Sequence, residues 1–174
     1  MNAREFYNRI NKSEKDIIAE FINFLDGNEI DYCVIGGIGI NAYCEPLITL
    51  DFDCVVFMES ASDTVKILRK NKTFKVKKHP HTIEIRSEYS DLKIHVQSDK
   101  RYQPFLKRAK YRNVLGYNLK VAAKEDILRG KIREYSDPER NELKREKDLL
   151  DIKRLIAKYP RLKKLIPETP ARAR

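Results

Sequence analysis

IGGIGINAY at residues 35–43 and TLDFD at residues 49–53 are the two segments that decide the fold of this chain. The apolar, β-prone run that leads into the first segment predicts a buried strand ending at the Gly36-Gly37 pair. A short helix is expected after the glycines, and it should end before Pro46, because proline disfavours helical geometry in the residue that precedes it. The first segment therefore predicts a strand, a glycine turn and a helix.

The second segment alternates with a period of two, which places Thr49, Asp51 and Asp53 on one face of a strand. At a rise of about 3.3 Å per residue, the two aspartates are about 6–7 Å apart at Cα, so their carboxylates can share one hard cation. Glycines at the start of a helix let a phosphate approach the backbone. Two plainer interpretations stay open: an ordinary turn at Gly36-Gly37, and solvent-facing carboxylates on an edge strand.

Together, the two segments resemble the Gly-Gly or Gly-Ser turn and the paired-aspartate strand of the DNA polymerase β-like nucleotidyltransferase superfamily. The likeness is to its minimal prokaryotic domains, including those of toxin-antitoxin systems. It covers residues 30–57 and extends through VAAKEDILRGK (121–131) and KREKDLLDIKRL (144–155), which look like the C-terminal helices of the family.

This resemblance implies that the turn of Gly36 and Gly37 holds the triphosphate of a nucleotide, while Asp51 and Asp53 hold Mg²⁺ (or Mn²⁺) for catalysis. A nucleoside monophosphate would then move to a hydroxyl acceptor on RNA, protein or a small molecule. Lys131 matches a helical lysine of the family pattern and is expected to contact the triphosphate, with a solvated helix lysine as the alternative. Thr49 is also predicted to be a nucleotide-binding residue, and it is expected to order the aspartate strand by hydrogen bonding.

The third carboxylate of such enzymes usually lies on a later adjacent strand, which here reads SDLKIHVQSD (90–99). The simplest register places His95 where an aspartate is expected, so His95 joins the predicted catalytic residues. Imidazole favours softer metals than Mg²⁺ and carries no negative charge. Asp91, earlier on the same face, is the alternative third metal ligand if the register differs.

The remaining pattern predicts an α+β fold in which a mixed sheet forms the nucleotidyltransferase core, at residues 1–117. A basic helical region at residues 118–174 is expected to pack on it. Helical spacing of apolar residues predicts helices and short β-prone runs predict strands. The expected helices are 13–27, 62–70 and two from residue 124 onward, joined near 136–138; the expected strands are 30–35, 49–57, 74–77, 82–86 and 92–96.

The net charge of +10 is concentrated in the second half of the chain. Residues 1–99 carry 13 Lys and Arg against 16 Asp and Glu, whereas residues 100–174 carry 23 against 10. Such an asymmetry is typical of a surface that faces phosphates, although solvated helix faces would also explain it. Aromatic residues interleave with the basic ones over residues 102–117 and would either stack on single-stranded nucleic acid or pack in the core.

Three cysteines, Cys33, Cys44 and Cys54, lie in or beside apolar runs without zinc-site spacing, which favours buried reduced thiols. His79 and His81 flank a proline and are expected in a surface hairpin. With no signal-like or membrane-spanning run, we expect a cytoplasmic protein with no membrane partner.

Two functional hypotheses remain. The first is a metal-dependent nucleotidyltransferase, and the second is a degenerate nucleotide- or nucleic-acid-binding module of the same fold. Either protein could have a protein partner such as an antitoxin.

Overall fold

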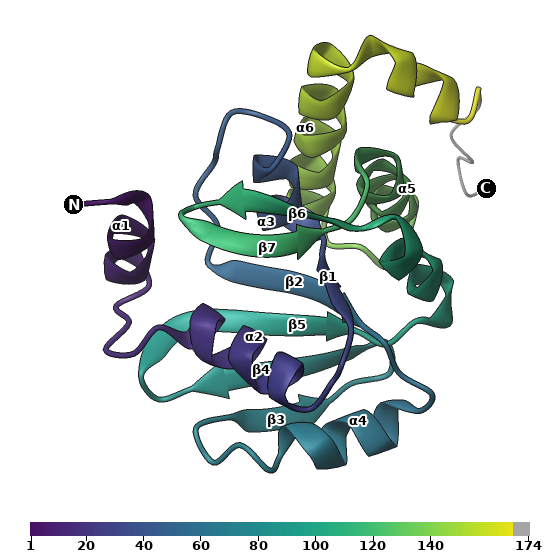
Figure 1. Cartoon of the computed structure of the whole chain (residues 1–174). Coiled ribbons are helices and arrows are strands. Elements are labelled where there is room, and N and C mark those ends of the chain that lie inside the picture. Colours follow the sequence, from purple (N-terminus) through teal and green to yellow (C-terminus); the bar gives the residue numbers. More distant parts are fainter. Residues whose placement is uncertain (169–174) are drawn as a thin grey trace.

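The computed structural model describes residues 1–168, which form one mixed seven-stranded sheet with helices around it (Figure 1). The strands run in the order β3-β4-β5-β2-β1-β7-β6. The strand bounds are β1 Tyr32–Val34, β2 Asp51–Val56, β3 Lys75–Lys78, β4 Thr82–Ser87, β5 Ser90–Gln97, β6 Lys110–Val114 and β7 Tyr117–Val121. The helix bounds are α1 Ala3–Ile10, α2 Ile17–Gly27, α3 Gly36–Asn41, α4 Ala61–Leu68, α5 Lys124–Tyr135 and α6 Glu142–Lys158, with 3-10 helices η1 Lys100–Arg108 and η2 Pro160–Leu165.

The centre of the sheet mixes strand directions, as expected from the sequence. β2 runs antiparallel to β1 and parallel to β5, while β1 is parallel to β7. The remaining neighbours pair antiparallel. The predicted α+β fold with a mixed sheet and C-terminal helices is therefore confirmed.

The two faces of β2 have opposite chemistry because its side chains alternate. Phe52 is fully buried and meets Phe21 of α2 edge-on, with ring centroids 6.1 Å apart. Asp51 and Asp53 project from the other face and remain partly exposed. The aromatic packing under α2 thus fixes the direction in which both carboxylates point.

On the carboxylate side, α3 follows β1 directly and packs against β2 and α5, and α5 packs along α6. Gly39 allows close contact, because a Cβ there would lie 3.0 Å from Ile127 of α5. β7 begins at Tyr117, so a boundary after residue 117 falls at the start of a strand of the central sheet. The separation into two regions therefore stays a prediction.

The segment in which aromatic and basic residues interleave forms η1 and the β6–β7 hairpin. Tyr102, Phe105 and Tyr117 are buried, whereas Tyr111 is 61% exposed. Core packing, rather than base stacking, accounts for the three buried aromatics. All three cysteines are free and buried, as expected. None of the helices within residues 1–168 has the length and apolarity that a membrane crossing requires.

Candidate active site

The glycine turn lies directly against the second aspartate of β2. Gly36 has a φ of +63°, a left-handed conformation that L side chains rarely adopt. A Cβ at this position would lie 2.3 Å from Oδ2 of Asp53, well inside contact distance. The backbone amide of Ile35 donates to the Asp53 carbonyl at 2.9 Å, which fixes the turn to β2. Only glycine therefore allows this approach of turn and carboxylate.

Three neighbouring strands place Asp53, His95 and Glu84 in one row across the sheet. Asp53 of β2 pairs in register with His95 of β5, and His95 pairs with Glu84 of β4. The imidazole Nδ1 is 3.3 Å from Oδ1 of Asp53, and Nε2 is 3.7 Å from Oε2 of Glu84. We call these three residues the Asp53–His95–Glu84 row. Its histidine faces a carboxylate from each ring nitrogen.

Neighbouring charges shift the pKa values of His95 and Glu84 in opposite directions. The hydrogen bond to Asp53 raises the pKa of His95, and the nearby charges of Asp53, Asp51 and Glu84 add to this effect against the opposing effect of burial. Arg86 donates to Glu84 at 2.7 Å and lowers the pKa of that carboxyl. Glu84 therefore stays ionised beside the imidazole.

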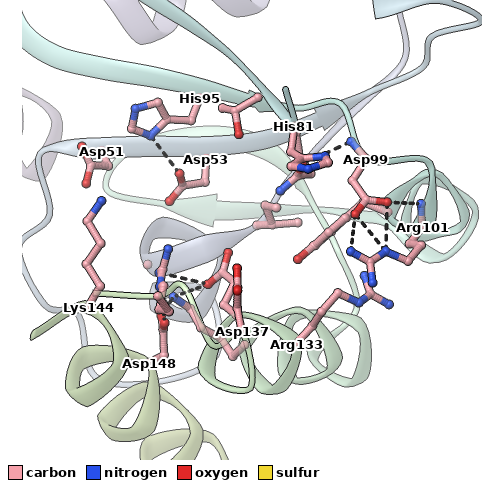
Figure 2. A pocket seen from close by; sticks show the side chains of 18 of the residues that line it. Asp51, Asp53, His81, His95, Asp99, Arg101, Arg133, Asp137, Lys144 and Asp148 are labelled. Atoms are coloured by element: carbon pink, nitrogen blue, oxygen red, sulfur yellow. Dashed lines mark hydrogen bonds and ion pairs between the residues drawn. The ribbon is translucent and has the colours of Figure 1, made fainter. Parts of the chain in front are cut away.

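The row and Asp51 form one wall of a cavity of about 830 Å³, which lies within the usual size range for small-molecule sites (Figure 2). Lys144 and Lys147 of α6 also line this cavity. Figure 2 shows the Lys144 side chain directed toward Asp51 and Asp53. Over residues 1–168, neither lysine forms an ion pair with a carboxylate. Lys144, which has no ion pair within residues 1–168, thus points across the cavity toward the two aspartates (Figure 2).

Lys131, which the sequence suggested as a triphosphate contact, forms ion pairs with carboxylates of α5 and α6 instead. Its side chain is 8% exposed, and its ammonium lies 2.9 Å from Asp148, 3.3 Å from Asp151 and 3.4 Å from Glu134. Burial alone would lower the pKa of Lys131, but these carboxylates raise it above its ordinary value. Although Lys131 reaches the edge of the cavity, its charge joins α5 to α6.

Asp91 and Thr49 lie away from the centre of the site. In the observed register Asp51 faces Lys93, so Asp91 is nearer the start of β5, and it pairs with Lys12 at 3.1 Å. The structure thus brings His95, and not Asp91, to Asp53. Thr49 accepts a hydrogen bond from the Asp51 amide through Oγ1 at 3.3 Å, while Gly37 lines the cavity.

Within residues 1–168, no three His, Cys, Asp or Glu side chains are already arranged as a complete metal site. Asp51 and Asp53 are oxygen donors with no Lys or Arg partner in ion-pair contact there. Side-by-side carboxylates without a cation repel one another. This chemistry fits a divalent ion whose remaining ligands come from a bound phosphate and water.

Sequence reasoning missed Glu84, Lys144 and Lys147. The surface hairpin expected at His79 and His81 is confirmed, since His81 is exposed and His79 partly exposed in the turn between β3 and β4, where both also line the cavity. The alternation in TIEIRS (82–87) could have indicated Glu84, since it shares a strand face with Thr82. The two lysines sit at helical spacing of three in the segment already assigned to a C-terminal helix. Only the fold shows that this helix face meets the aspartates.

The sequence matches no protein-family model and no curated protein. Among solved structures, an antigenic nucleotidyltransferase-like protein from Paracoccidioides brasiliensis is similar with a TM-score of 0.56 at 21% identity, covering 81% of this chain and 74% of that one. The antibiotic-resistance factor ANT(2'')-Ia is similar with a TM-score of 0.61 at 11% identity, covering 85% of this chain and 86% of that one. The lincosamide antibiotic adenylyltransferase LnuA gives 0.53 at 16% identity, with 83% and 98% covered. This chain thus shares the nucleotidyltransferase fold, which by itself does not define an activity.

Proposed function

We propose that this protein is a metal-dependent nucleotidyltransferase that moves a nucleoside monophosphate from a nucleoside triphosphate to a hydroxyl group. The observation that carries the proposal is the contact between the Gly36 turn and Asp53 at the wall of the cavity. Such a turn positions phosphates next to carboxylates that can hold a cation. The fold shared with adenylyltransferases supports the same chemistry.

Asp51 and Asp53 would hold Mg²⁺ or Mn²⁺, with His95 beside them. When bound, the ion neutralises phosphate charge and orients the reacting groups. The acceptor oxygen would form a bond to the α-phosphorus while the bond from that phosphorus to the bridging oxygen breaks. Pyrophosphate would leave, and the hydroxyl proton would pass to solvent at the cavity mouth. The residues of the chain contribute position and charge to this transfer.

Lys144 and Lys147 are the proposed contacts for the outer phosphates. Both line the cavity, and Lys144 extends toward the two aspartates (Figure 2). An ammonium facing a carboxylate pair across open space leaves room for a metal-bound triphosphate between them. We therefore propose the two lysines of α6, in place of Lys131, as the triphosphate contacts.

Mg²⁺ together with a nucleoside triphosphate is expected to raise the melting temperature, because a ligand that binds only the folded state stabilises it. At one hundred times Kd, the gain is about 2.7 kcal/mol, or roughly 5–10 °C for a chain of this size. The double substitution Asp51→Asn with Asp53→Asn should abolish this shift, which differential scanning fluorimetry measures directly. Asp91→Asn, an exposed carboxylate outside the cavity, is the matched control. A full shift in the double variant would rule out these carboxylates as the site.

A specific observation favours a second candidate, a binding module of the same fold that has lost catalysis. His95 occupies the position next to Asp53 where a third carboxylate is expected. Transfer of label from an α-labelled triphosphate to RNA, protein or small hydroxyl compounds distinguishes the two. Stabilisation by the triphosphate without any transfer would favour the binding module.

The basic surface makes nucleic acid a proposed partner, alongside a partner protein. Lys153, Lys158, Arg161, Lys163 and Lys164 are all exposed on α6 and η2. Binding to RNA or single-stranded DNA should therefore weaken as salt increases, because phosphate contacts release counterions. Fluorescence anisotropy between 50 and 200 mM salt checks this, with about a tenfold or greater loss expected for a few contacts. Affinity that does not depend on salt, or no binding at 50 mM salt, would contradict a nucleic-acid partner. The basic surface would then serve a protein partner or solubility.

A further inference from the structure

In the Asp53–His95–Glu84 row a histidine lies between two carboxylates, and the 3.7 Å between Nε2 and Glu84 would shorten to a hydrogen bond if Nδ1 bound a cation. A histidine that binds a metal through one ring nitrogen usually donates the other N–H to a carboxylate, which fixes the tautomer and the ring orientation. Here Nε2 faces Glu84 at 3.7 Å and Nδ1 faces Asp53 at 3.3 Å. Glu84 is itself held by Arg86. The ring is therefore oriented with Nδ1 toward the aspartates.

The separation between Nδ1 and Oδ1 of Asp53 also suits a shared ion. Neighbouring ligands of an octahedral cation with bonds of about 2.1 Å are about 3.0 Å apart. The observed 3.3 Å requires only a small adjustment of either side chain. A cation placed between them would replace the present contact between imidazole and carboxylate.

Asp51, Asp53 and His95 would provide two oxygens and one nitrogen. An imidazole suits first-row transition metals better than Mg²⁺, which prefers oxygen ligands and dehydrates reluctantly. Among the ions named for the proposed transferase, Mn²⁺ tolerates both ligand types. We infer that His95 is a direct ligand of the site through Nδ1, that Glu84 is its positioning residue, and that the site therefore takes Mn²⁺ in preference to Mg²⁺.

The inference rests on the proposed function only for the cation, so its test uses the metal alone. Mn²⁺ bound to the wild-type protein should show nitrogen coupling in pulsed electron paramagnetic resonance, and His95→Gln should abolish it. Calorimetry should give a lower Kd for Mn²⁺ than for Mg²⁺, by on the order of tenfold. His95→Asp is expected to reduce this preference, because it replaces the nitrogen ligand by an oxygen ligand.

Glu84→Gln should weaken Mn²⁺ binding about 10- to 100-fold, the usual cost of losing a carboxylate behind a metal-binding histidine. Nitrogen-15 NMR of the His95 ring with a diamagnetic ion such as Zn²⁺ bound should show Nε2 carrying the proton in wild type and a changed Nε2 signal in Glu84→Gln, whereas in the metal-free protein Nδ1 donates to Asp53. His81→Gln, a histidine that also lines the cavity, is the matched control and should leave Kd unchanged.

Mn²⁺ binding without nitrogen coupling, or unchanged in His95→Gln, would overturn the inference and leave the proposed transferase intact. Nitrogen coupling in a protein that triphosphate fails to stabilise would support the inference and count against the transferase. If neither ion binds wild-type protein at millimolar concentration, the inference is wrong.

Discussion

Gly36→Ala is expected to destabilise the protein by about 3 kcal/mol and to eliminate stabilisation by Mg²⁺ and triphosphate. The left-handed backbone conformation costs a non-glycine residue about 1–2 kcal/mol. Overpacking adds a similar cost, because the new Cβ would lie 2.3 Å from Oδ2 and 2.8 Å from Cβ of Asp53. To relieve the overlap, Asp53 must move from its position beside His95. A displacement near 1 Å can reduce a reaction about a hundredfold, so the damage should reach the site as well as the fold.

Two other glycines provide graded controls for this substitution. A Cβ at Gly27 meets nothing within 4 Å, so Gly27→Ala should leave the melting temperature unchanged or slightly raised. A Cβ at Gly37 would lie 3.4 Å from Thr49, an ordinary contact, so Gly37→Ala should be milder than Gly36→Ala. Melting temperatures with and without ligand separate the two effects. A stable Gly36→Ala protein with full ligand stabilisation would disprove the role assigned to this turn.

The parts of the fold that could be predicted from sequence were those encoded locally. The glycine turn and the Asp51/Asp53 alternation lie within twenty residues and depend on backbone geometry alone. The period of two placed His95 on the polar face of β5, the family resemblance placed it at the site, and the observed register brings it next to Asp53. The expected start of the helix was two residues late, because α3 begins at Gly36 itself.

Contacts between distant segments could not be predicted in this way. Glu84 reaches the site only because β4 pairs beside β5, and Lys144 only because α6 packs across the cavity. Helix periodicity alone did not show which face of α5 is buried, so Lys131 was expected to be available to a ligand. In the structure this lysine is surrounded by carboxylates from α5 and α6.

Lys131→Met is expected to lower the free energy of unfolding by about 3–5 kcal/mol, the usual effect of removing one partner from a buried ion pair. Asp148 and Asp151 are both less than 5% exposed, and without the lysine their charges depend on Arg140 and Arg154. These remaining pairs favour the lower end of the range. Chemical denaturation at pH 7 measures the loss.

Lys144→Met is the matched variant, because it removes a lysine from the same cavity at an exposed position without an ion pair in residues 1–168. It should keep the wild-type unfolding free energy and lose part of the triphosphate stabilisation. In Lys131→Met, the destabilisation should instead shrink as the pH falls, since protonation neutralises the carboxylates that have lost the lysine. Burial already raises the pKa of one of them, Glu134. If Lys131→Met instead keeps normal stability and loses triphosphate binding, Lys131 is a ligand-binding residue. A residue whose only role is to join two helices must weaken the fold when it is removed.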